Sequence, residues 1–559
     1  MTRNEYWTAP RNDLVAAPLH RKAILGSQSV VDALRRHGVR VIFSLSGNQI
    51  MPLYDACIDV GIRIVHVRHE AAAVFMADAW AQVTGEIGVA LLTAGPGFCN
   101  GLSPVYSAYQ AESPILLLTG DSPVAEDGAG AFQELDQVAM SRPVTKMSRR
   151  VLSASAMSSA VDEAISIARS GRPGPVHLVL PLDVLKGECG MEERSAAPIS
   201  ALPMAPTDSD AKHLAVLIDQ AQRPIIICGP TSARSRFRKM LLECSRRMAI
   251  PMIIMESPRG LRDPSLGSVA RHVAQADLVV TVAKDVDFGV GFGRVGTFGK
   301  DAEFIVLDAD AEKLDRAKRL LGGRVRSWWQ CDPIRFLTAV AMLPKDWSAR
   351  DEWMQIVTTS IASRNLAGKT PAAKPGSIDT RDLCERVQRF LQGTSAPLLV
   401  CDGGEFGQWA QGFCSAPVRI VNGSSGAIGG GLCYAIAAKI ARPECTVFAL
   451  MGDGSSGFHF MEFDTAVREN APFIAIIGAD HRWNAEYLIQ KRDYGIDRLI
   501  GCELSPTARY EQVATALGGY GVCVNRIDDV DRALKLALDS ARPACISVAI
   551  SGEAAPVFE

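Results

Sequence analysis

Several features that would restrict the function of this protein are absent from its sequence. The 559 residues include 14 cysteines but no CxxC pair, so a clustered disulfide framework is not expected. No apolar run approaches the roughly 20 residues that a membrane-spanning helix needs. The net charge of −2 provides no general attraction to nucleic acid or to an anionic membrane. We therefore expect a soluble protein with neither nucleic acid nor membrane as a partner.

The N-terminal segment also lacks the apolar stretch of a signal peptide. Residues 1–21 are polar and contain proline. Most cysteines lie in apolar or strand-like runs, for example Cys228, Cys401 and Cys545, where a thiol is usually a small core residue. Both observations favour a reducing, cytoplasmic location.

What the sequence does contain is a repeated alternation of short apolar strands with amphipathic helices. The chain is too long for one core, and looser stretches at 196–207 and 367–377 divide it into three blocks. The predicted strands are 41–43, 62–67, 89–93, 115–119 and 176–180, then 224–228, 251–255, 278–282 and 304–308, and finally 397–402, 419–422, 446–451, 473–478 and 545–549. Such alternation is typical of open, mostly parallel sheets with helices on both faces. We predict three successive α/β domains, at residues 21–190, 207–345 and 376–552.

The most informative motif follows a predicted strand of the third block. The tetrapeptide Gly452–Ser455 comes directly after strand 446–451, and residues 457–470 are predicted to form a helix. Alone, an Asp-Gly pair more often makes a tight turn, but N–H groups of a glycine-rich turn at a helix N-terminus suit a phosphate. The next strand leads to Asp480, which places a second carboxylate at the same sheet edge. Two carboxylates and a diphosphate form the all-oxygen environment that Mg²⁺ prefers.

Asp453, followed 27 positions later by Asp480, resembles the metal-binding signature of thiamine-diphosphate-dependent enzymes. In that family the first Asp, a second Asn or Asp and a nearby backbone carbonyl hold the metal. The resemblance therefore implies that Asp453, Asp480 and the carbonyl of Arg482 bind Mg²⁺. The commonest form of the signature ends in Asn-Asn, whereas this chain has Ala479-Asp480, and Asp remains an acceptable oxygen ligand.

A second motif, Arg68-His69-Glu70, lies where a predicted strand meets a helix in the first block. Considered alone, an acidic residue in the first helical turn is simply favoured by the helix dipole. The resemblance implies more: Glu70 bonds the pyrimidine ring of thiamine diphosphate held by the neighbouring subunit and promotes formation of its carbanion. It also implies a homodimer or homotetramer with shared active sites.

Further loops are similar to those of acetolactate synthases and benzaldehyde lyase. Asn48, Gln49 and Gln133 fall where the family places amides near the reacting carbon, although each alone is equally well interpreted as a turn amide. Ile428 corresponds to the large apolar residue that bends the cofactor. The residues predicted to contact the cofactor are Pro96, Asn100, Gly404, Glu405, Phe406, Gly426, Ile428, Gly452, Asp453, Gly454, Ser455 and Asp480.

Glu486 distinguishes this chain from the acetolactate synthases, which have an apolar residue at that position. It lies 33 positions after Asp453, where pyruvate decarboxylases have a catalytic Glu. A carboxyl beside the cofactor can transfer a proton. The alternative is a solvated helix residue paired with Lys491 or Arg492. We predict that Glu486 is catalytic.

The resemblance extends from about residue 21 to residue 549 and implies pyrimidine-binding, central and diphosphate-binding α/β domains. The expected enzyme depends on thiamine diphosphate and Mg²⁺ and decarboxylates a 2-oxo acid, with protonation or carboligation of the enamine. One alternative is a lyase that cleaves a 2-hydroxy ketone or 2-hydroxyacyl compound. Another is a non-catalytic nucleotide-binding scaffold, against which Glu70 argues because a scaffold has no use for that carboxylate.

Overall fold

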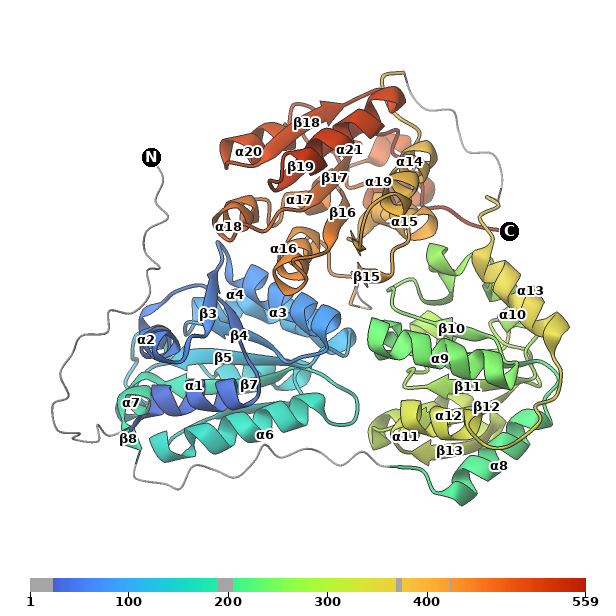
Figure 1. The fold of residues 1–559 in the computed structure, drawn as a ribbon, viewed down its shortest axis with the longest axis horizontal. Coiled ribbons are helices and arrows are strands. Elements are labelled where there is room, and N and C mark those ends of the chain that lie inside the picture. Colours follow the sequence, from blue (N-terminus) through green and yellow to red (C-terminus); the bar gives the residue numbers. More distant parts are fainter. Residues whose placement is uncertain (1–23, 190–204, 368–374, 423–424) are drawn as a thin grey trace.

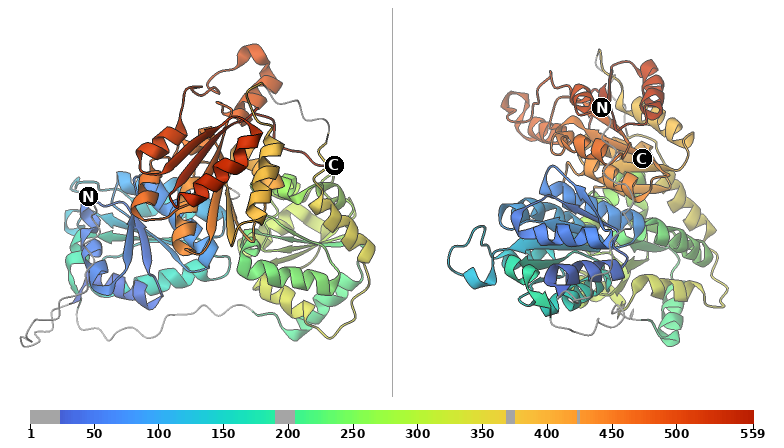
Figure 2. Two further views of the ribbon diagram at one scale, coloured as in Figure 1. Left: turned by 45° about the horizontal axis from the view of Figure 1, so that its top comes forward. Right: turned by 60° about the vertical axis from the view of Figure 1, so that its left-hand side comes forward.

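Three α/β domains pack around a common centre in the computed structural model, which describes residues 24–189, 205–367, 375–422 and 425–559. Figure 1 shows the first domain in blue and cyan beside the central domain in green, with the third domain in orange and red above both. The views in Figure 2 show that each domain keeps its own sheet, covered by helices. The predicted succession of three mostly parallel α/β domains is confirmed.

The first domain has a six-stranded parallel sheet in the order β3-β2-β4-β5-β7-β6. Its strands are β2 (Val41–Ser44), β3 (Arg63–His66), β4 (Gly88–Leu92), β5 (Ile115–Asp121), β6 (Met147–Arg150) and β7 (Val176–Pro181), and the short strands β1 (Ile24–Leu25) and β8 (Glu188–Cys189) form a separate antiparallel pair. Its helices are α1 (Gly26–Arg36), α2 (Met51–Val60), α3 (Glu70–Thr84), α4 (Pro96–Gln110), α5 (Gln137–Ser141), α6 (Met157–Arg169) and α7 (Leu182–Lys186).

The central domain has a five-stranded parallel sheet in the order β10-β9-β11-β12-β13. Its strands are β9 (Pro224–Cys228), β10 (Met252–Ile254), β11 (Leu278–Val282), β12 (Glu303–Asp308) and β13 (Val325–Gln330). Its helices are α8 (Asp208–Asp219), α9 (Ser235–Met248), α10 (Ala270–Val273), α11 (Ala311–Leu321), α12 (Pro333–Ala341) and α13 (Asp351–Ala362).

The third domain has a six-stranded parallel sheet in the order β15-β14-β16-β17-β19-β18. Its strands are β14 (Pro397–Cys401), β15 (Val418–Val421), β16 (Thr446–Gly452), β17 (Ile474–Ala479), β18 (Tyr520–Val524) and β19 (Ala544–Ala549). Its helices are α14 (Thr380–Gln392), α15 (Gly404–Phe413), α16 (Gly431–Ala441), α17 (Asp453–Ser456), α18 (Glu462–Arg468), α19 (Asn484–Tyr494), α20 (Tyr510–Ala516) and α21 (Val530–Asp539).

The first and third domains share a hydrophobic core through α3 and α16. Both helices are apolar on nearly all sides, as helices buried between two layers are. Phe75 packs edge-to-face on Tyr434, whose hydroxyl donates to the buried Asp78 at 3.0 Å. This packing determines how the strand-end loops of the two domains lie relative to each other.

Strands at sheet edges account for the differences from the predicted strands. β6, β13 and β18 were not predicted, and each is the outermost strand of its sheet. These three strands are partly exposed and lack the continuous apolar run by which a central parallel strand is recognised, whereas β10, at the opposite edge of the central sheet, is buried and was predicted. The predicted linkers lie partly outside the described residues, as do residues 21 and 190 that bound the first predicted domain.

Most cysteines are buried in the cores, as the sequence indicated. Among the described residues, none of the helices combines the length and the apolar character needed to cross a membrane.

Candidate active site

Neighbouring strands bring the two predicted metal-binding carboxylates to one edge of the third sheet. The parallel register of β16 and β17 pairs Gly452 with Gly478, so Asp453 and Asp480 follow adjacent strand ends. The helix predicted for residues 457–470 is wrong in its extent, because a single helical turn, α17, starts at Asp453 itself and α18 covers only Glu462–Arg468. Glycine and serine are poor helix formers, which explains why the first helix ends after one turn.

Both carboxyl groups are strongly influenced by burial. Asp453, 3% exposed, accepts from the backbone N–H groups of Gly454 at 3.0 Å and His481 at 2.9 Å. Burial raises the pKa of Asp453 to about 6. Burial, together with the charge of Asp453, raises the pKa of Asp480 to about 7. A negative charge on one carboxyl disfavours ionisation of the other, so a divalent cation bound between them would stabilise both ionised forms.

The chain after Asp480 turns sharply through His481, whose φ of 58° lies in the left-handed region. A short antiparallel bridge then holds Arg482 opposite Glu503. Leu504 N donates to the carbonyl of His481 at 2.7 Å, and Trp483 N donates to the carbonyl of Cys502 at 2.8 Å. Strained backbone of this kind is concentrated at functional sites. The Arg482 carbonyl as a metal ligand stays a prediction.

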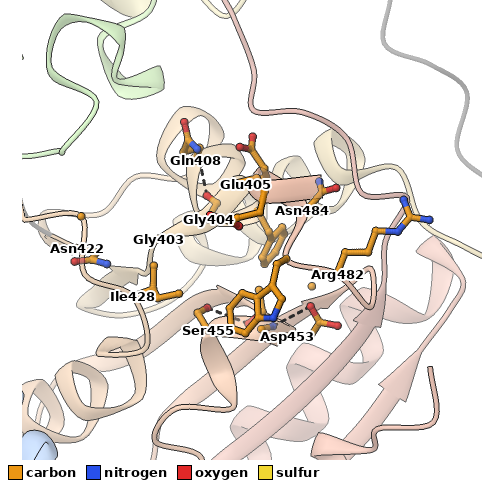
Figure 3. A pocket seen from close by; sticks show the side chains of 18 of the residues that line it. Gly403, Gly404, Glu405, Gln408, Asn422, Ile428, Asp453, Ser455, Arg482 and Asn484 are labelled. Atoms are coloured by element: carbon orange, nitrogen blue, oxygen red, sulfur yellow. Dashed lines mark hydrogen bonds between the residues drawn. The ribbon is translucent and has the colours of Figure 1, made fainter. Parts of the chain in front are cut away.

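A cavity of about 310 Å³ opens beside these carboxylates (Figure 3). It is lined by Ser257, Pro258, Arg259, Gly403, Gly404, Glu405, Phe406, Gln408, Gln411, Asn422, Gly426, Ile428, Gly452, Asp453, Gly454, Ser455, Gly478, Asp480, Arg482, Trp483, Asn484, Ala485 and Glu486. All the cofactor contacts predicted in the third domain therefore fall in one cavity.

Two close approaches explain why glycines occur in this cavity wall. Ile428 packs so tightly on Gly403 that a Cβ there would lie 2.6 Å from the isoleucine Cγ2. The ring of Trp483 would lie 2.7 Å from a Cβ on Gly454. A larger residue at either glycine would displace a side chain that lines the cavity.

The rim of the cavity carries further charges. Burial raises the pKa of Glu405, whose carboxylate accepts a hydrogen bond from Ala555 N; Arg259 opposes this rise and Glu486 adds to it. Glu486 itself is exposed in the single chain. No ion pair of Glu486 with Lys491 or Arg492 occurs within the described part of the chain, and Arg492 pairs with Asp493 at 2.7 Å. The pairing in that alternative is thus not observed, while the exposure of Glu486 agrees with a solvated helix residue, and the catalytic role stays a prediction.

The predicted residues of the first domain form a second cluster. Glu70 begins α3 and is 9% exposed, and Asn100 Nδ2 donates to its Oε2 at 3.0 Å. A Cβ on Gly97 would lie 3.4 Å from Glu70 Oε1. Pro96 is the first residue of α4, so the N-terminal turn of this helix borders the carboxylate.

Two of the three predicted amides in this cluster are hydrogen-bonded to each other. Gln49, 3% exposed, donates from Nε2 to Gln133 Oε1 at 2.8 Å and accepts from Thr93 Oγ1 at 2.6 Å. This orientation leaves the Gln133 amide nitrogen available as a hydrogen-bond donor. Gln133 has a left-handed φ of 64°. Asn48, which directly precedes Gln49, is exposed.

The two clusters are separate within one chain. The cavity of the third domain is lined by residues of the central and third domains, and none of the first-domain residues Glu70, Gln133 or Asn48 is among them.

The cavity suits a diphosphate and Mg²⁺. A Cβ at Gly404, Gly426 or Gly452 would meet no atom within 4 Å, so backbone is openly accessible there. The buried side-chain oxygens of Gln411 and Asn484 have no hydrogen-bond partner, although both residues line the cavity. The described residues contain no group of three or more His, Cys, Asp or Glu side chains that could hold a metal. The two carboxylates would therefore need oxygens of a bound diphosphate to complete the coordination of Mg²⁺.

Sequence analysis missed Arg259, which lines the cavity, and the role of Asp402, which holds the cavity loops without lining the cavity. Asp402, included in a predicted strand, is buried and accepts from the N–H groups of Gly403, Gly429 and Gly431, which ties two cavity loops together. Its position at a strand end followed by glycines was an available signal. Arg259 carried no such signal, since only domain packing brings it to the cavity.

Comparisons with known proteins agree with this geometry. Models of the thiamine pyrophosphate enzymes match the chain three times: the N-terminal TPP binding domain at residues 24–140, the central domain at 211–322 and the C-terminal TPP binding domain at 402–548. A probable acetolactate synthase of Mycobacterium bovis is 32% identical over 92% of this chain and 94% of its own. Two proteins called 2-hydroxyacyl-CoA lyase 2 are also similar, at 30% identity in Danio rerio (90% of this chain, 87% of theirs) and 29% in Homo sapiens (92% and 87%).

Proposed function

Because this chain belongs to the thiamine pyrophosphate (thiamine diphosphate) enzymes, we propose that it is a Mg²⁺-dependent member that decarboxylates a 2-oxo acid and then protonates the product or joins it to a second carbonyl compound. The observation that carries this proposal is the adjacent pair of carboxyls, buried Asp453 and half-buried Asp480, beside an open cavity. When bound, thiamine diphosphate supplies a carbanion that adds to a carbonyl carbon and accepts the electron pair of the broken bond.

The two clusters have different roles in this proposed reaction. Asp453, Asp480 and the Arg482 carbonyl hold Mg²⁺, while the open backbone at Gly404, Gly426 and Gly452 accommodates the diphosphate, and Ile428 supports the rings. Glu70, held by Asn100, bonds the pyrimidine ring. Gln133, oriented by Gln49, donates to the substrate oxygen. Glu486 moves a proton at the reacting centre.

A second candidate function is cleavage of a 2-hydroxyacyl compound or 2-hydroxy ketone. It is favoured by the likeness to proteins called 2-hydroxyacyl-CoA lyase 2 and by the carboxyl at Glu486, where acetolactate synthases have an apolar residue. Cleavage of a 2-hydroxyacyl compound releases an aldehyde or ketone and leaves a one-carbon unit, whereas decarboxylation releases CO₂.

Product analysis distinguishes the two candidates. Purified protein, loaded with thiamine diphosphate and Mg²⁺, is incubated with a panel of 2-oxo acids and separately with 2-hydroxyacyl compounds. CO₂ release from a 2-oxo acid supports the first candidate, and aldehyde release without CO₂ supports the second. Absence of turnover on both panels by cofactor-loaded protein would count against both.

We further propose that two chains share each site, because Glu70 does not line the cavity of its own chain. We expect Glu70→Gln and Asp453→Ala proteins, each inactive alone, to regain activity when mixed and allowed to exchange subunits. Random pairing makes half the dimers hybrids with one intact site each, which predicts roughly a quarter of wild-type activity. Turnover assays and native mass spectrometry of the mixture check this. Verified hybrids without activity would refute the shared site.

Arg259 is expected to attract the anionic part of the substrate. Its side chain is exposed at the cavity and has no ion pair among the described residues. Arg259→Gln should raise the KM for a 2-oxo acid about 10-fold with little change in kcat. The reason is that the lost charged hydrogen bond is equally strong in the enzyme–substrate complex and in the transition state. Arg262→Gln is the control, since Arg262 is exposed nearby but does not line the cavity. Equal KM values in both variants would disprove this role.

A further inference from the structure

A buried carboxylate of the third domain binds the backbone immediately before Glu70. Glu462, the first residue of α18, is 1% exposed. Its Oε1 accepts from the N–H of Arg68 at 2.9 Å and from the N–H of His69 at 3.1 Å. The two ends of these hydrogen bonds are separated by 394 and 393 positions in the sequence. In Figure 1, α18 lies beside the end of β3, the strand from which this loop leaves the first sheet.

The contact is specific because both carboxylate oxygens are used. The second oxygen, Oε2, accepts from Thr465 Oγ1 at 2.6 Å. Arg468 then donates to Thr465 Oγ1 at 3.0 Å and to the carbonyl of His66 at 2.7 Å, at the end of β3. Residues of α18 are therefore hydrogen-bonded to both ends of the loop between β3 and α3.

Among the residues that the structure describes, Glu462 is the acceptor of both N–H groups and the loop supplies none of its own. His69 is the N-cap of α3, with extended backbone, and its side chain accepts from Ala71 N at 3.1 Å. This cap satisfies the N–H groups inside the helix, but the N–H groups of Arg68 and His69 point outward, to Glu462. Glu70 is the next residue after these two N–H groups.

We propose that Glu462 is a positioning residue for Glu70, and that it therefore acts on the active site of the partner subunit rather than on the site formed by its own domain. This follows from the proposed shared site: Glu70 of one chain completes the cavity of the other. Glu462 lies six residues beyond α17, close in sequence to Asp453, yet its hydrogen bonds are to the first domain.

Hydrogen exchange in the apo protein tests the contact without reference to activity. In Glu462→Ala, the backbone amides of Arg68 and His69 should exchange roughly 10-fold faster or more, because the opening of this loop no longer breaks two hydrogen bonds. Glu462→Gln keeps an oxygen acceptor and should retain the protection. The matched control is Asp464→Ala on the same helix, which removes partly exposed pairs with Arg68 at 3.6 Å and with Arg468 at 2.9 Å but leaves the acceptor of the two N–H groups in place. Unchanged exchange in the Ala variant would overturn the proposal.

Turnover should be lost in the variant that loses protection from hydrogen exchange and kept in the variant that retains it. Glu462→Ala should lower kcat about 10²-fold, the effect of a misplacement on the order of 1 Å at a reacting group. Its cofactor and Mg²⁺ affinities, measured by calorimetry, should stay within a few-fold of wild type, because the cavity is intact. Glu462→Gln should recover most of the activity, and thermal unfolding of both variants verifies that they are folded. Loss of cofactor affinity in the Gln variant would contradict the proposal.

Subunit mixing identifies the site on which Glu462 acts. Glu462→Ala mixed with Asp453→Ala should regain activity, because the hybrid has one site with a normal Glu70 loop and an intact Asp453. Glu462→Ala mixed with Glu70→Gln should not, since every site then has a defective first domain. The reverse pattern would mean that Glu462 supports the cavity of its own chain and would overturn the proposal. If the Glu70→Gln and Asp453→Ala pair itself fails to complement, the shared site is wrong, while the exchange experiment still tests the contact.

Discussion

Replacement of Asp453 by Ala is expected to abolish measurable binding of thiamine diphosphate in the presence of Mg²⁺. Asp453 is buried, faces Asp480 at the adjacent strand end and lines the cavity. Its removal leaves the metal with one carboxylate from the chain and leaves the diphosphate charge uncompensated. Isothermal titration of the apo protein with the cofactor, with and without Mg²⁺, measures the effect.

Thermal unfolding provides the control for this variant. A ligand at 100 times its Kd stabilises a protein by about 2.7 kcal/mol, so cofactor plus Mg²⁺ should raise the Tm of the wild type but not of Asp453→Ala. Cofactor affinity equal to that of the wild type would exclude Asp453 from the metal site.

The pH dependence of this effect has a defined direction. The pKa values of Asp453 and Asp480 are raised to about 6 and about 7, so the fold favours their protonated forms. Their contribution to the stability of the apo protein is therefore present below about pH 4 and is lost as the pH rises through 6 and 7. Metal binding requires the ionised forms, so Mg²⁺ affinity and the Tm increase that it causes should grow from pH 6 to pH 8.

Glu486→Gln is expected to lower kcat by roughly 10²- to 10⁴-fold, the contribution of a positioned general acid–base. The carboxyl lies at the rim of the cavity on α19 and close enough to Glu405 to affect its pKa. Gln has nearly the same shape, so cofactor and metal affinity should be unchanged in titration calorimetry. Steady-state kinetics measure the loss of turnover.

The matched control is Asp493→Asn on the same helix. Asp493 pairs with Arg492 on the surface and does not line the cavity, so its replacement should change kcat less than two- to threefold. Turnover of Glu486→Gln within the same narrow range would return Glu486 to the role of a solvated helix residue. Accumulation of a cofactor adduct in the Gln variant would favour the lyase candidate.

Local patterns in the sequence were sufficient for the central strands of all three sheets. The runs around Ile226, Val280 and Ala449 are buried on both faces, so hydrophobicity alone marks them. The turn after β16 and the start of α3 were also predictable, because glycine, a capping residue and an acidic first turn are local signals. Family resemblance then assigned chemistry to Asp453 and Glu70, which composition and spacing alone do not supply.

The tertiary structure decided what depends on contacts between distant segments. Edge strands such as β18 form because a neighbouring strand offers hydrogen-bond partners, which their partly exposed sequences do not reveal. Arg259 reaches the cavity, and Glu462 reaches the loop of Glu70 nearly 400 positions earlier, only because the domains pack together. Such contacts leave no periodic pattern in the local sequence, because the packing of whole domains determines which distant residue each side chain contacts. The sequence by itself thus determined the central strands of the three sheets, whereas domain packing decided which strand ends can meet.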